Sequence, residues 1–527
     1  MATASLLSAE GVHLLRGRWL VAAITSVCSA GFLLFGYDQG VMSGVVISSS
    51  WLETMGHPSS VVVGTITALY PVGGVVGAIL AAFTAEPLGR KRTLLLGALL
   101  VAIGGVLMGC SSSRGQFAAA RALVGLGTGY TTSVTPVYQS EISAHEQRGW
   151  HVCCQLSTML AGLLLAYCMN YGFYFHPGSV QWRFPLAFQC VFAVYILAVT
   201  PFLPDTPRWL MNHDGTPERG LAVLAQLRGK GEDDEAVRRE AEEITEAISL
   251  ENKEQGTWGD LFRSNGVSAD KRFYLAVGIQ FMQQMTGINI ITYYAPTLYT
   301  TSLGMSQESA LLLGCFTQLW YLLASFVTWY TIDRIGRRGL LISMALAMCL
   351  VLVGEALAIA TGTPGGAVAA VVCLFLFEAA FTWGWMACVW CYPPEILPLR
   401  IRAKGSALAT AADFIGNVIV VQVTPVGIGT MGWLFFLVWA VFNLANAAVV
   451  WLFYPETGGL ALEAVDFVFT ADTDGVAGNG RGLGKLQWAR VRVADQAVRA
   501  SRARRGNGRL VGASERGLLD ESAPLLT

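Results

Sequence analysis

The sequence predicts an all-α membrane protein, and three observations support this fold class. Of the 527 residues, 54% are hydrophobic and only 13% are charged, whereas soluble domains have about 25% charged residues. The hydrophobic residues form long blocks, each near the ~20 residues that a helix needs to cross the hydrocarbon core. Two loop patterns also recur in the two halves of the chain. These features predict twelve transmembrane helices in two six-helix halves.

The predicted N-terminal half, residues 20–204, contains six hydrophobic blocks. The first block follows Arg16 and Arg18, but it is too long for the core of a signal peptide and is interpreted as a permanent span. The six blocks are residues 20–48, 60–83, 93–112, 117–137, 150–170 and 186–204.

The predicted C-terminal half, residues 272–453, contains six more blocks. Gly and Pro inside them are compatible with membrane helices, because neighbouring helices can satisfy the freed backbone groups. The blocks are residues 272–298, 308–332, 338–361, 366–391, 404–426 and 431–453.

Three polar segments lie outside the two halves. Residues 1–19 form a short N-terminus, and residues 205–271 form a linker whose charged stretch, 231–254, has the spacing of amphipathic helices. The tail, residues 454–527, is expected to be largely disordered, with attraction of its arginines to anionic lipid as the alternative.

Short-loop Lys and Arg residues predict the orientation, because they favour the cytosolic side. With the N-terminus inside, the outer loops hold only Arg114 and Arg183, so both termini are expected to be cytosolic. The inner loops hold Arg90, Lys91, Arg92, Arg148, Arg334, Arg337, Arg338, Arg400, Arg402 and Lys404. The expected location is the plasma membrane. A vacuolar or endosomal membrane is the alternative, because both chain ends contain an acidic residue four positions before a Leu pair.

An internal repeat links the inner loops of the two halves. EPLGRKR from Glu86 matches DRIGRR from Asp333, and their glycines lie 247 residues apart. A second pattern, an acid followed seven residues later by Arg, recurs at an offset of 254. Two parallel halves place a substrate site between them near mid-membrane. The repeated charges are either simple topology signals or ion pairs that close the inner side: Glu86, Arg90, Glu141, Arg148, Asp333, Arg337, Glu395 and Arg402.

Asp38 and Arg121 fall inside predicted spans, where an unpaired ionised group is costly. They are expected to pair with each other. The pair either fixes two helices or carries the proton of a symporter, with Asp38 as the acceptor and Arg121 as its partner.

Amide side chains gather in the seventh predicted span. Amides offer both donors and acceptors without net charge, as the hydroxyls of a neutral solute require, although amides can also join helices. The candidates are Gln283, Gln284 and Asn289, with Tyr293 one turn later and Gln155 in the fifth span. Phe35 and Trp390 could cover the apolar face of a sugar ring or simply pack.

No nucleophile–base pair, metal-ligand spacing or phosphate-binding loop occurs, so neither an enzyme, a metal nor a cofactor is predicted. The expected partners are a small solute, a proton and membrane lipid, without nucleic acid, and the protein is expected to be a monomer.

Nine strings in order resemble the sugar porter family of the major facilitator superfamily, most like fungal monosaccharide (hexose) transporters. They are FGYDQGVMSG, RALVGLGTG, PVYQSEIS, WRFPLAFQ, LPDTPRWL, QFMQQMTGINIITYYAP, DRIGRR, PPEILPLR and PETGGLALE. The resemblance implies a major facilitator fold and transport of a hexose or pentose by alternating access, as proton-coupled symport. Facilitated uniport, transport of a polyol, disaccharide or quinate, and a transporter-like sugar sensor stay open.

The resemblance also assigns roles to residues. Asp38 matches the acidic position of proton-coupled members and Arg121 its partner. Gln155, Gln283, Gln284, Asn289, Trp390 and Asn417 match sugar-binding positions of the family.

Several positions depart from the family pattern. Met386 and Ala387 replace the Gly-Pro that usually breaks the tenth helix, so that break is in doubt. Tyr321 and Phe414 stand where Asn and Trp are common, and Pro87 and Gly458 replace basic residues. Glucose cannot be assumed as the solute.

Overall fold

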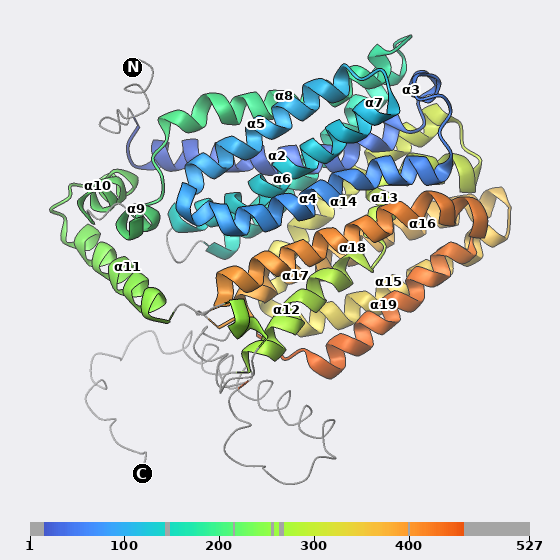
Figure 1. Ribbon diagram of the computed structural model, residues 1–527. Helices are drawn as coiled ribbons and strands as arrows, with labels where there is room; N and C mark the ends of the chain where they lie inside the picture. Colours follow the sequence, from blue (N-terminus) through green and yellow to red (C-terminus); the bar gives the residue numbers. More distant parts are fainter. Residues whose placement is uncertain are drawn as a thin grey trace, which may run out of the picture.

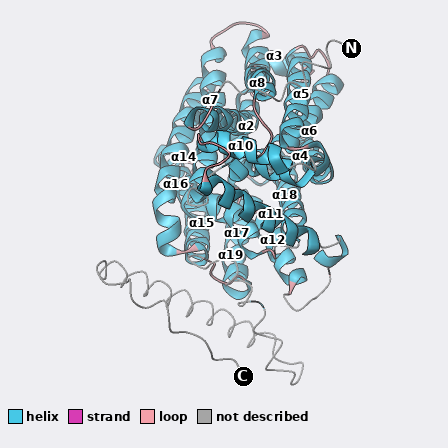
Figure 2. Ribbon diagram, turned by 90° about the vertical axis from the view of Figure 1, so that its left-hand side faces the viewer, coloured by secondary structure: helices cyan, strands magenta, loops and turns pink. Residues whose placement is uncertain are grey.

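The computed structural model describes residues 15–142, 148–213, 217–254, 258–262, 268–398, 401–457 and 469. Within these residues the secondary structure is helical, and no strand is present (Figure 2). The predicted all-α membrane fold is confirmed.

The N-terminal half contains six long helices and one short one. The first and fifth long helices pack along each other, and so do the second and fourth. Glycines allow this close approach: a Cβ on Gly36 would lie 1.8 Å from the carbonyl oxygen of Met159. The helices are α2 (Arg18–Val45), α3 (Ser49–Thr54), α4 (Ser60–Leu88), α5 (Arg90–Gly109), α6 (Arg114–Ile142), α7 (Arg148–Tyr174) and α8 (Val180–Val199).

The C-terminal half has two interrupted spans. The first breaks at Gly287, whose φ of 92° is a left-handed conformation that glycine adopts without a Cβ clash. The second contains a π-helical turn, η4 (Thr382–Met386). The helices are α12 (Ala269–Gln284), α13 (Ile288–Leu303), α14 (Gln307–Ile335), α15 (Arg337–Ala360), α16 (Pro364–Phe381), α17 (Ala387–Ile396), α18 (Arg402–Met431) and α19 (Leu434–Phe453).

The π turn answers the doubt raised by Met386 and Ala387. The tenth span departs from α geometry at this place although the usual Gly-Pro is missing. Gly384 lies within the turn, and a Cβ there would meet the Met344 side chain at 2.5 Å. Close packing against α15 therefore accompanies the break, and π turns are frequent at functional sites.

Ten stretches of the described chain are long and apolar enough to cross a membrane. The other two predicted spans coincide with α6 and with the interrupted pair α12 and α13. α6 has 29 residues but is rich in Thr and Gly, and neither part of the interrupted pair exceeds 16 residues. The number of twelve spans stays a prediction. Each of the predicted spans has a helical counterpart in the structure.

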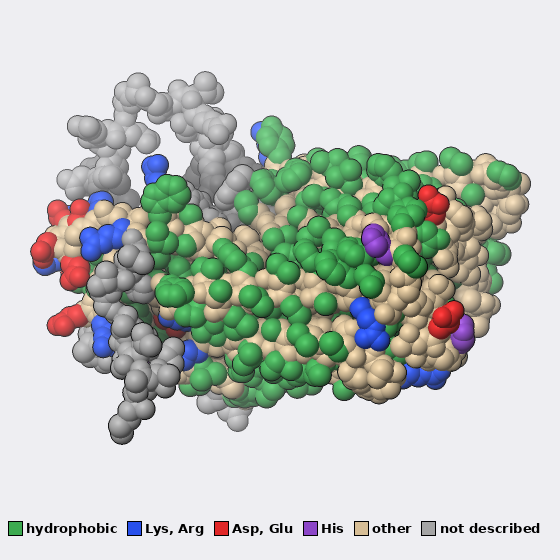
Figure 3. All heavy atoms as spheres, turned by 90° about the horizontal axis from the view of Figure 1, so that it is seen from above, with side chains coloured by type: hydrophobic (Ala, Val, Ile, Leu, Met, Phe, Trp, Pro, Cys, Tyr) green, Lys and Arg blue, Asp and Glu red, His purple; other side chains and the backbone are tan. Residues whose placement is uncertain are grey.

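Short helices of the linker cover one end of the bundle, which we call the inner end. They are α9 (Pro207–His213), α10 (Pro217–Arg228), α11 (Glu235–Glu254) and η3 (Trp258–Leu261), and the single turn η2 (Thr200–Phe202) ends the apolar span just before them. Figure 1 shows α9, α10 and α11 at this end and α3 at the opposite end. Hydrophobic side chains cover the middle of the face in Figure 3, whereas charged side chains gather at the inner end. This distribution suits a lipid-facing belt.

The two halves meet along three helix pairs, α4 with α18, α7 with α14 and α2 with α13. Their interface contains polar contacts as well as packing. Tyr167 of α7 donates to the carbonyl oxygens of Ile291 and Thr292 in α13, both at 3.0 Å. Ser157 and Ser325 share a hydrogen bond of 2.9 Å. Among the predicted solute contacts, Phe35 of α2 meets Phe414 of α18 across this interface, and Tyr293 of α13 packs in one cluster with residues of the N-terminal half.

Candidate substrate and proton sites

A chain of buried amides begins in the break between α12 and α13. Asn289 donates to Gln284 Oε1, and Gln284 Nε2 donates to Asp413 Oδ1 of α18 at 2.5 Å. Both amides and the carboxyl are buried. The break allows this arrangement, because Gly287 turns the chain so that residues on two separate helices face α18.

The neighbouring glutamines of α12 donate to the tenth span. Gln283 Nε2 donates to the carbonyl oxygen of Trp385 and Gln280 Nε2 to that of Val389, each at 3.4 Å. A backbone carbonyl oxygen only accepts hydrogen bonds, so the side-chain nitrogen of each glutamine, and not its oxygen, points towards the tenth span. The carbonyl oxygens of both glutamines are buried and have no partner among the described residues.

Other predicted solute contacts also have unpartnered buried atoms. Within the described residues, no partner is present for Gln155 Nε2 or Asn417 Oδ1, whereas the Tyr293 hydroxyl lies close enough to Asn417 for a side-chain hydrogen bond. Gln155 belongs to the N-terminal half, whereas Tyr293 and Asn417 belong to the C-terminal half. Buried polar atoms are nearly always paired. Unpaired buried atoms of the predicted solute contacts are therefore present in both halves.

Aromatic side chains lie beside these polar groups. Phe35 of α2 meets Phe414 of α18 edge to face, with ring centroids 6.3 Å apart. Trp390 is half-buried and packs against the core of the C-terminal half. Tyr321 is buried and meets Phe381 at 6.3 Å. Two of the departures from the family pattern, Phe414 and Tyr321, thus add apolar surface at the interface or near the π turn.

The intramembrane charges Asp38 and Arg121 are both fully buried, but they do not form the expected ion pair within 4.0 Å. Asp38 Oδ2 accepts a long hydrogen bond of 3.4 Å from Thr128. The Arg121 guanidinium lies over the Tyr70 ring, 4.8 Å from its centroid. Its three nitrogens have no hydrogen-bond acceptor among the described residues.

Arg121 nevertheless connects the predicted proton site with the predicted solute site. The guanidinium lies near enough to Asp38, Tyr293 and Tyr294 for electrostatic interaction. Tyr293 and Tyr294 belong to α13 of the other half. One cation therefore faces both the carboxyl of α2 and the tyrosines beside the amide chain.

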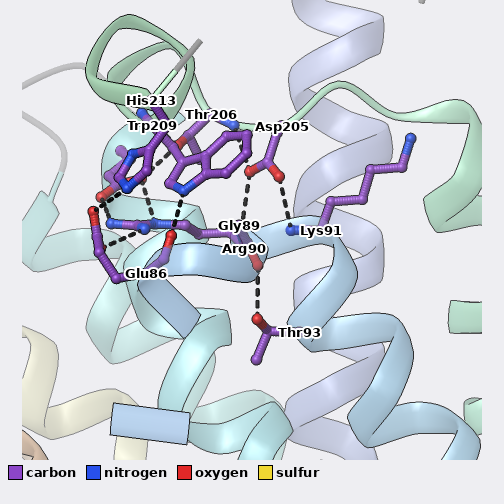
Figure 4. Close-up of polar contacts among 10 residues, drawn as sticks. Glu86, Gly89, Arg90, Lys91, Thr93, Asp205, Thr206, Trp209 and His213 are labelled. Atoms are coloured by element: carbon purple, nitrogen blue, oxygen red, sulfur yellow. Dashed lines mark hydrogen bonds and ion pairs between the residues drawn. The ribbon is translucent and has the colours of Figure 1, made fainter. Parts of the chain in front are cut away.

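Figure 4 shows the inner end of the N-terminal half. Arg90 binds Glu141 at 2.9 Å and Glu86 at 2.8 Å. Asp205 of the linker accepts from the backbone N–H groups of Arg90 at 3.2 Å and Lys91 at 3.4 Å. It therefore caps the start of α5.

Gly89 makes room for this cap. Its φ is 84°, and a Cβ there would lie 2.4 Å from Asp205 Oδ2. Burial raises the pKa of Asp205, while the hydrogen bonds and the Arg90 charge oppose that rise.

The inner end of the C-terminal half repeats this arrangement. Glu456 accepts from the N–H groups of Arg337 at 2.9 Å and Arg338 at 3.0 Å, at the start of α15. Arg337 binds Glu395 at 3.2 Å. Gly336, with φ 95°, stands where Gly89 stands in the first half.

Two further contacts match. Thr206 donates to Glu141 and Thr457 donates to Glu395, each at 2.6 Å. Pro-Asp-Thr at 204–206 and Pro-Glu-Thr at 455–457 are thus a third repeated element. Both strings contributed to the family resemblance, yet their equivalence was missed. Their spacing of 251 residues, between the other two offsets, was the available signal.

The predicted inner charges are only partly brought together. The structure joins Glu86, Arg90 and Glu141 in one half and Arg337 and Glu395 in the other. Arg402 donates through Nε to the carbonyl oxygen of Leu397 at 3.1 Å. Arg148 begins α7, but its side chain and that of Asp333 lie outside the described residues.

Sequence reasoning missed three buried acids of the C-terminal half. Asp413 lies in α18, Glu355 in α15 and Glu378 in α16, and all are 4% exposed or less. Each stands inside a predicted span, so the signal that selected Asp38 applied to them equally. Asp413 is the one that contacts a predicted solute residue.

Comparisons with known proteins agree with this architecture. A family profile described as "Sugar (and other) transporter" matches residues 22–469. "MFS-type transporter oryC" of Aspergillus oryzae is 39% identical over 88% of this chain and 89% of its own. "Sugar transporter STL1" of Saccharomyces cerevisiae is 33% identical over 86% of this chain and 82% of its own.

A solved structure shares the fold. The "proton:xylose symporter XylE" bound to 6-bromo-6-deoxy-D-glucose superposes with a TM-score of 0.72, and other structures give its source as E. coli. It is 26% identical and covers 85% of this chain and 99% of its own. The family match spans both halves and both candidate sites, and the chain belongs to the sugar porter family of the major facilitator superfamily.

Proposed function

We propose that the protein takes up a monosaccharide, a hexose or pentose, together with a proton by alternating access. One observation carries this proposal: buried polar atoms without partners among the described residues occur in both halves, on Gln155 of the N-terminal half and on Gln283 and Asn417 of the C-terminal half. Sugar hydroxyls both donate and accept, so a single sugar can satisfy such a mixed set. The sugar-transporting relatives support the same solute class.

The predicted solute contacts divide into three groups in this proposal. Gln155 binds from the N-terminal half. Gln283, Gln284, Asn289, Tyr293 and Asn417 bind from the C-terminal half. Phe35 and Trp390 cover the apolar face of the ring and exclude water. Binding from both halves favours closure around the solute, because the sugar can contact the two halves at the same time only when the halves move together.

Asp38 is the proposed proton carrier. Among the described residues, its carboxyl has no ion pair and one weak hydrogen bond, so the ionised and protonated forms can be close in free energy. Arg121 faces both Asp38 and Tyr293. A solute that contacts Tyr293 would move Arg121 relative to Asp38, which links solute binding to the charge of Asp38. The structural likeness to a proton:xylose symporter supports this coupling.

The inner ion pairs are proposed to act in gating. Arg90 and Arg337 each join the ends of helices within one half. Between the halves, Trp258 of the linker stacks near Phe83 of α4, with centroids 4.9 Å apart. Lys404 of α18 lies 5.6 Å from the Trp258 ring. Opening the inner side would separate α4 from α18 and break these contacts.

The remaining parts of the proposal concern location and assembly. Basic inner loops favour both termini in the cytosol, and the plasma membrane suits an uptake carrier. The exposed hydrophobic belt is proposed to contact lipid directly, with the protein acting as a monomer.

Uptake of radiolabelled solutes into cells without their own hexose carriers tests the proposal. Hexoses, pentoses, polyols, disaccharides and quinate should be compared at two external pH values. Saturable uptake of a monosaccharide that increases at acidic pH is expected. Uptake without pH dependence would indicate a uniporter. Absence of uptake for every solute, with the protein at the cell surface, would contradict transport and favour a sensor.

A further inference from the structure

Asp413 places an acid inside the proposed solute site. Its side chain is 4% exposed, and its described hydrogen bond comes from the Gln284 amide at 2.5 Å. No Lys, Arg or His among the described residues forms an ion pair with it within 4.0 Å. A buried carboxylate without a cation is costly, and a cationic group of a bound solute would relieve that cost.

The hydrogen bonds of the amide chain all run from donor to acceptor towards Asp413. Asn289 donates to Gln284, and Gln284 donates to Asp413. Gln280 and Gln283 likewise each donate one side-chain N–H to a backbone carbonyl oxygen of the tenth span. The α12 side of the site therefore directs amide donors towards other protein groups, away from a ligand.

The two helices that meet at this carboxyl, α12 and α18, carry further acceptors without described donors. The carbonyl oxygens of Gln280 and Gln283 have no described donor. Asn417 lies one helical turn after Asp413 on α18, so the two share a face, and its Oδ1 also has no donor. A hydroxyl brings one donor to such a surface. A protonated amine brings three donors and the missing positive charge.

We propose that the transported solute carries a protonated amino group and that Asp413 binds it, so that the protein selects amino sugars or amino polyols over neutral sugars. This inference rests on the proposed function and specifies its solute. The hydroxyls of the same solute remain for Gln155, Tyr293 and the aromatic residues. Asp413 is thus a specificity-determining residue separate from the proton carrier Asp38.

Isosteric solute pairs test the selectivity in the full-length protein. Uptake of radiolabelled glucosamine should be compared with that of glucose, and mannosamine with mannose, in cells without their own hexose carriers. The amino and hydroxyl forms differ little in size, so their uptake ratio reports the recognition of charge. A hydrogen bond to a charged group is worth ~1.5–3 kcal/mol, so an amine preference of at least about tenfold is expected. A ratio near one overturns the proposal.

Variants assign the preference to Asp413. Asp413→Asn keeps an acceptor for Gln284 but removes the charge, and it should bring the ratio to within about threefold of one. Glu378→Gln removes another fully buried carboxyl of the same half and should leave the ratio unchanged. An unchanged ratio in Asp413→Asn overturns the assignment, and so does a loss of proton-driven accumulation with the amine preference intact.

The wild-type ratio alone can refute the inference if Asp413→Asn fails to reach the membrane. The two proposals also fail in different ways. Uptake of neutral sugars without amine preference contradicts the role of Asp413 and leaves sugar transport standing. Absence of uptake for all four solutes contradicts the proposed function itself.

Discussion

Replacing Asp205 with alanine is expected to loosen the inner end of the N-terminal half. The carboxyl accepts from the N–H groups of Arg90 at 3.2 Å, Lys91 at 3.4 Å and Thr206 at 2.9 Å. Alanine leaves these three donors without that acceptor. The first two belong to the start of α5, where backbone donors have no partner inside the helix.

The expected cost follows from these contacts. Loss of a helix cap costs ~0.5–2 kcal/mol, and burial of the carboxyl offsets the favourable position of its charge beside the helix N-terminus. Asp205→Ala should therefore cost about 1 kcal/mol. Asp205→Asn should cost less, because its amide oxygen can still accept from Arg90 and Thr206 and because no charge is buried.

Thermal unfolding of the detergent-purified protein provides the assay. Asp205→Ala should lower the melting temperature by a few degrees. The matched control is Asp233→Ala, since the Asp233 side chain is 94% exposed in the same linker and such surface pairs contribute little. Equal melting temperatures for Asp205→Ala and the control would refute the capping argument.

A pH series adds a second test of Asp205. Burial raises its pKa in the folded protein, so the native state binds this proton more readily than the unfolded chain. The stability that protonation contributes is present below the ordinary pKa, near ~4, and is lost as pH rises through the folded value. The advantage of wild type over Asp205→Asn should therefore shrink as pH rises above ~4. A constant or growing advantage would contradict the raised pKa.

Three transport predictions use the same expression system. Gln284→Ala breaks the amide chain to Asp413, so uptake should fall at least about tenfold at unchanged surface amount, as measured with labelled solute. Asp38→Asn removes the proposed proton carrier, so accumulation against a gradient should stop while solute counterflow in vesicles continues. Tyr293→Phe removes a buried hydroxyl beside Asn417, so KM should rise about threefold to tenfold in a concentration series.

The controls separate these effects from general damage. Tyr299→Phe removes a hydroxyl from the same helix, where it pairs with Thr317 at 2.8 Å, and KM should not change. Full uphill accumulation by Asp38→Asn would exclude Asp38 as the proton carrier. Normal uptake by Gln284→Ala would exclude the amide chain from the solute site.

Hydrophobic block length was enough to predict most of the fold. A membrane span must cross the fixed thickness of the hydrocarbon core, so each span appears in the sequence as a hydrophobic block of predictable length. The break at Gly287 was harder to predict, because a left-handed glycine leaves no change in hydrophobicity. The predicted block 272–298 therefore read as one helix where the structure has α12 and α13. The π turn was also missed, because it depends on packing of Gly384 against α15.

The candidate site was partly predictable for a similar reason. Charged and amide residues inside apolar spans mark polar interiors, which identified Asp38 and Gln284. Asp413 carried the same signal and was overlooked beside the family pattern. The separation of Asp38 from Arg121 could not be foreseen, because it depends on how Tyr70 and α13 surround the guanidinium.

The paired Pro-Asp-Thr and Pro-Glu-Thr elements have a consequence for biosynthesis. Each lies at the end of the sixth predicted span of its own half. Its acid accepts from backbone N–H groups at the start of the third span, α5 in one half and α15 in the other. A half can therefore complete its inner end with residues that leave the ribosome immediately after its last span. The N-terminal half does not need the second half for this step. The inner end of each bundle is in this respect self-contained, and the surface where the solute is proposed to bind lies between the two bundles.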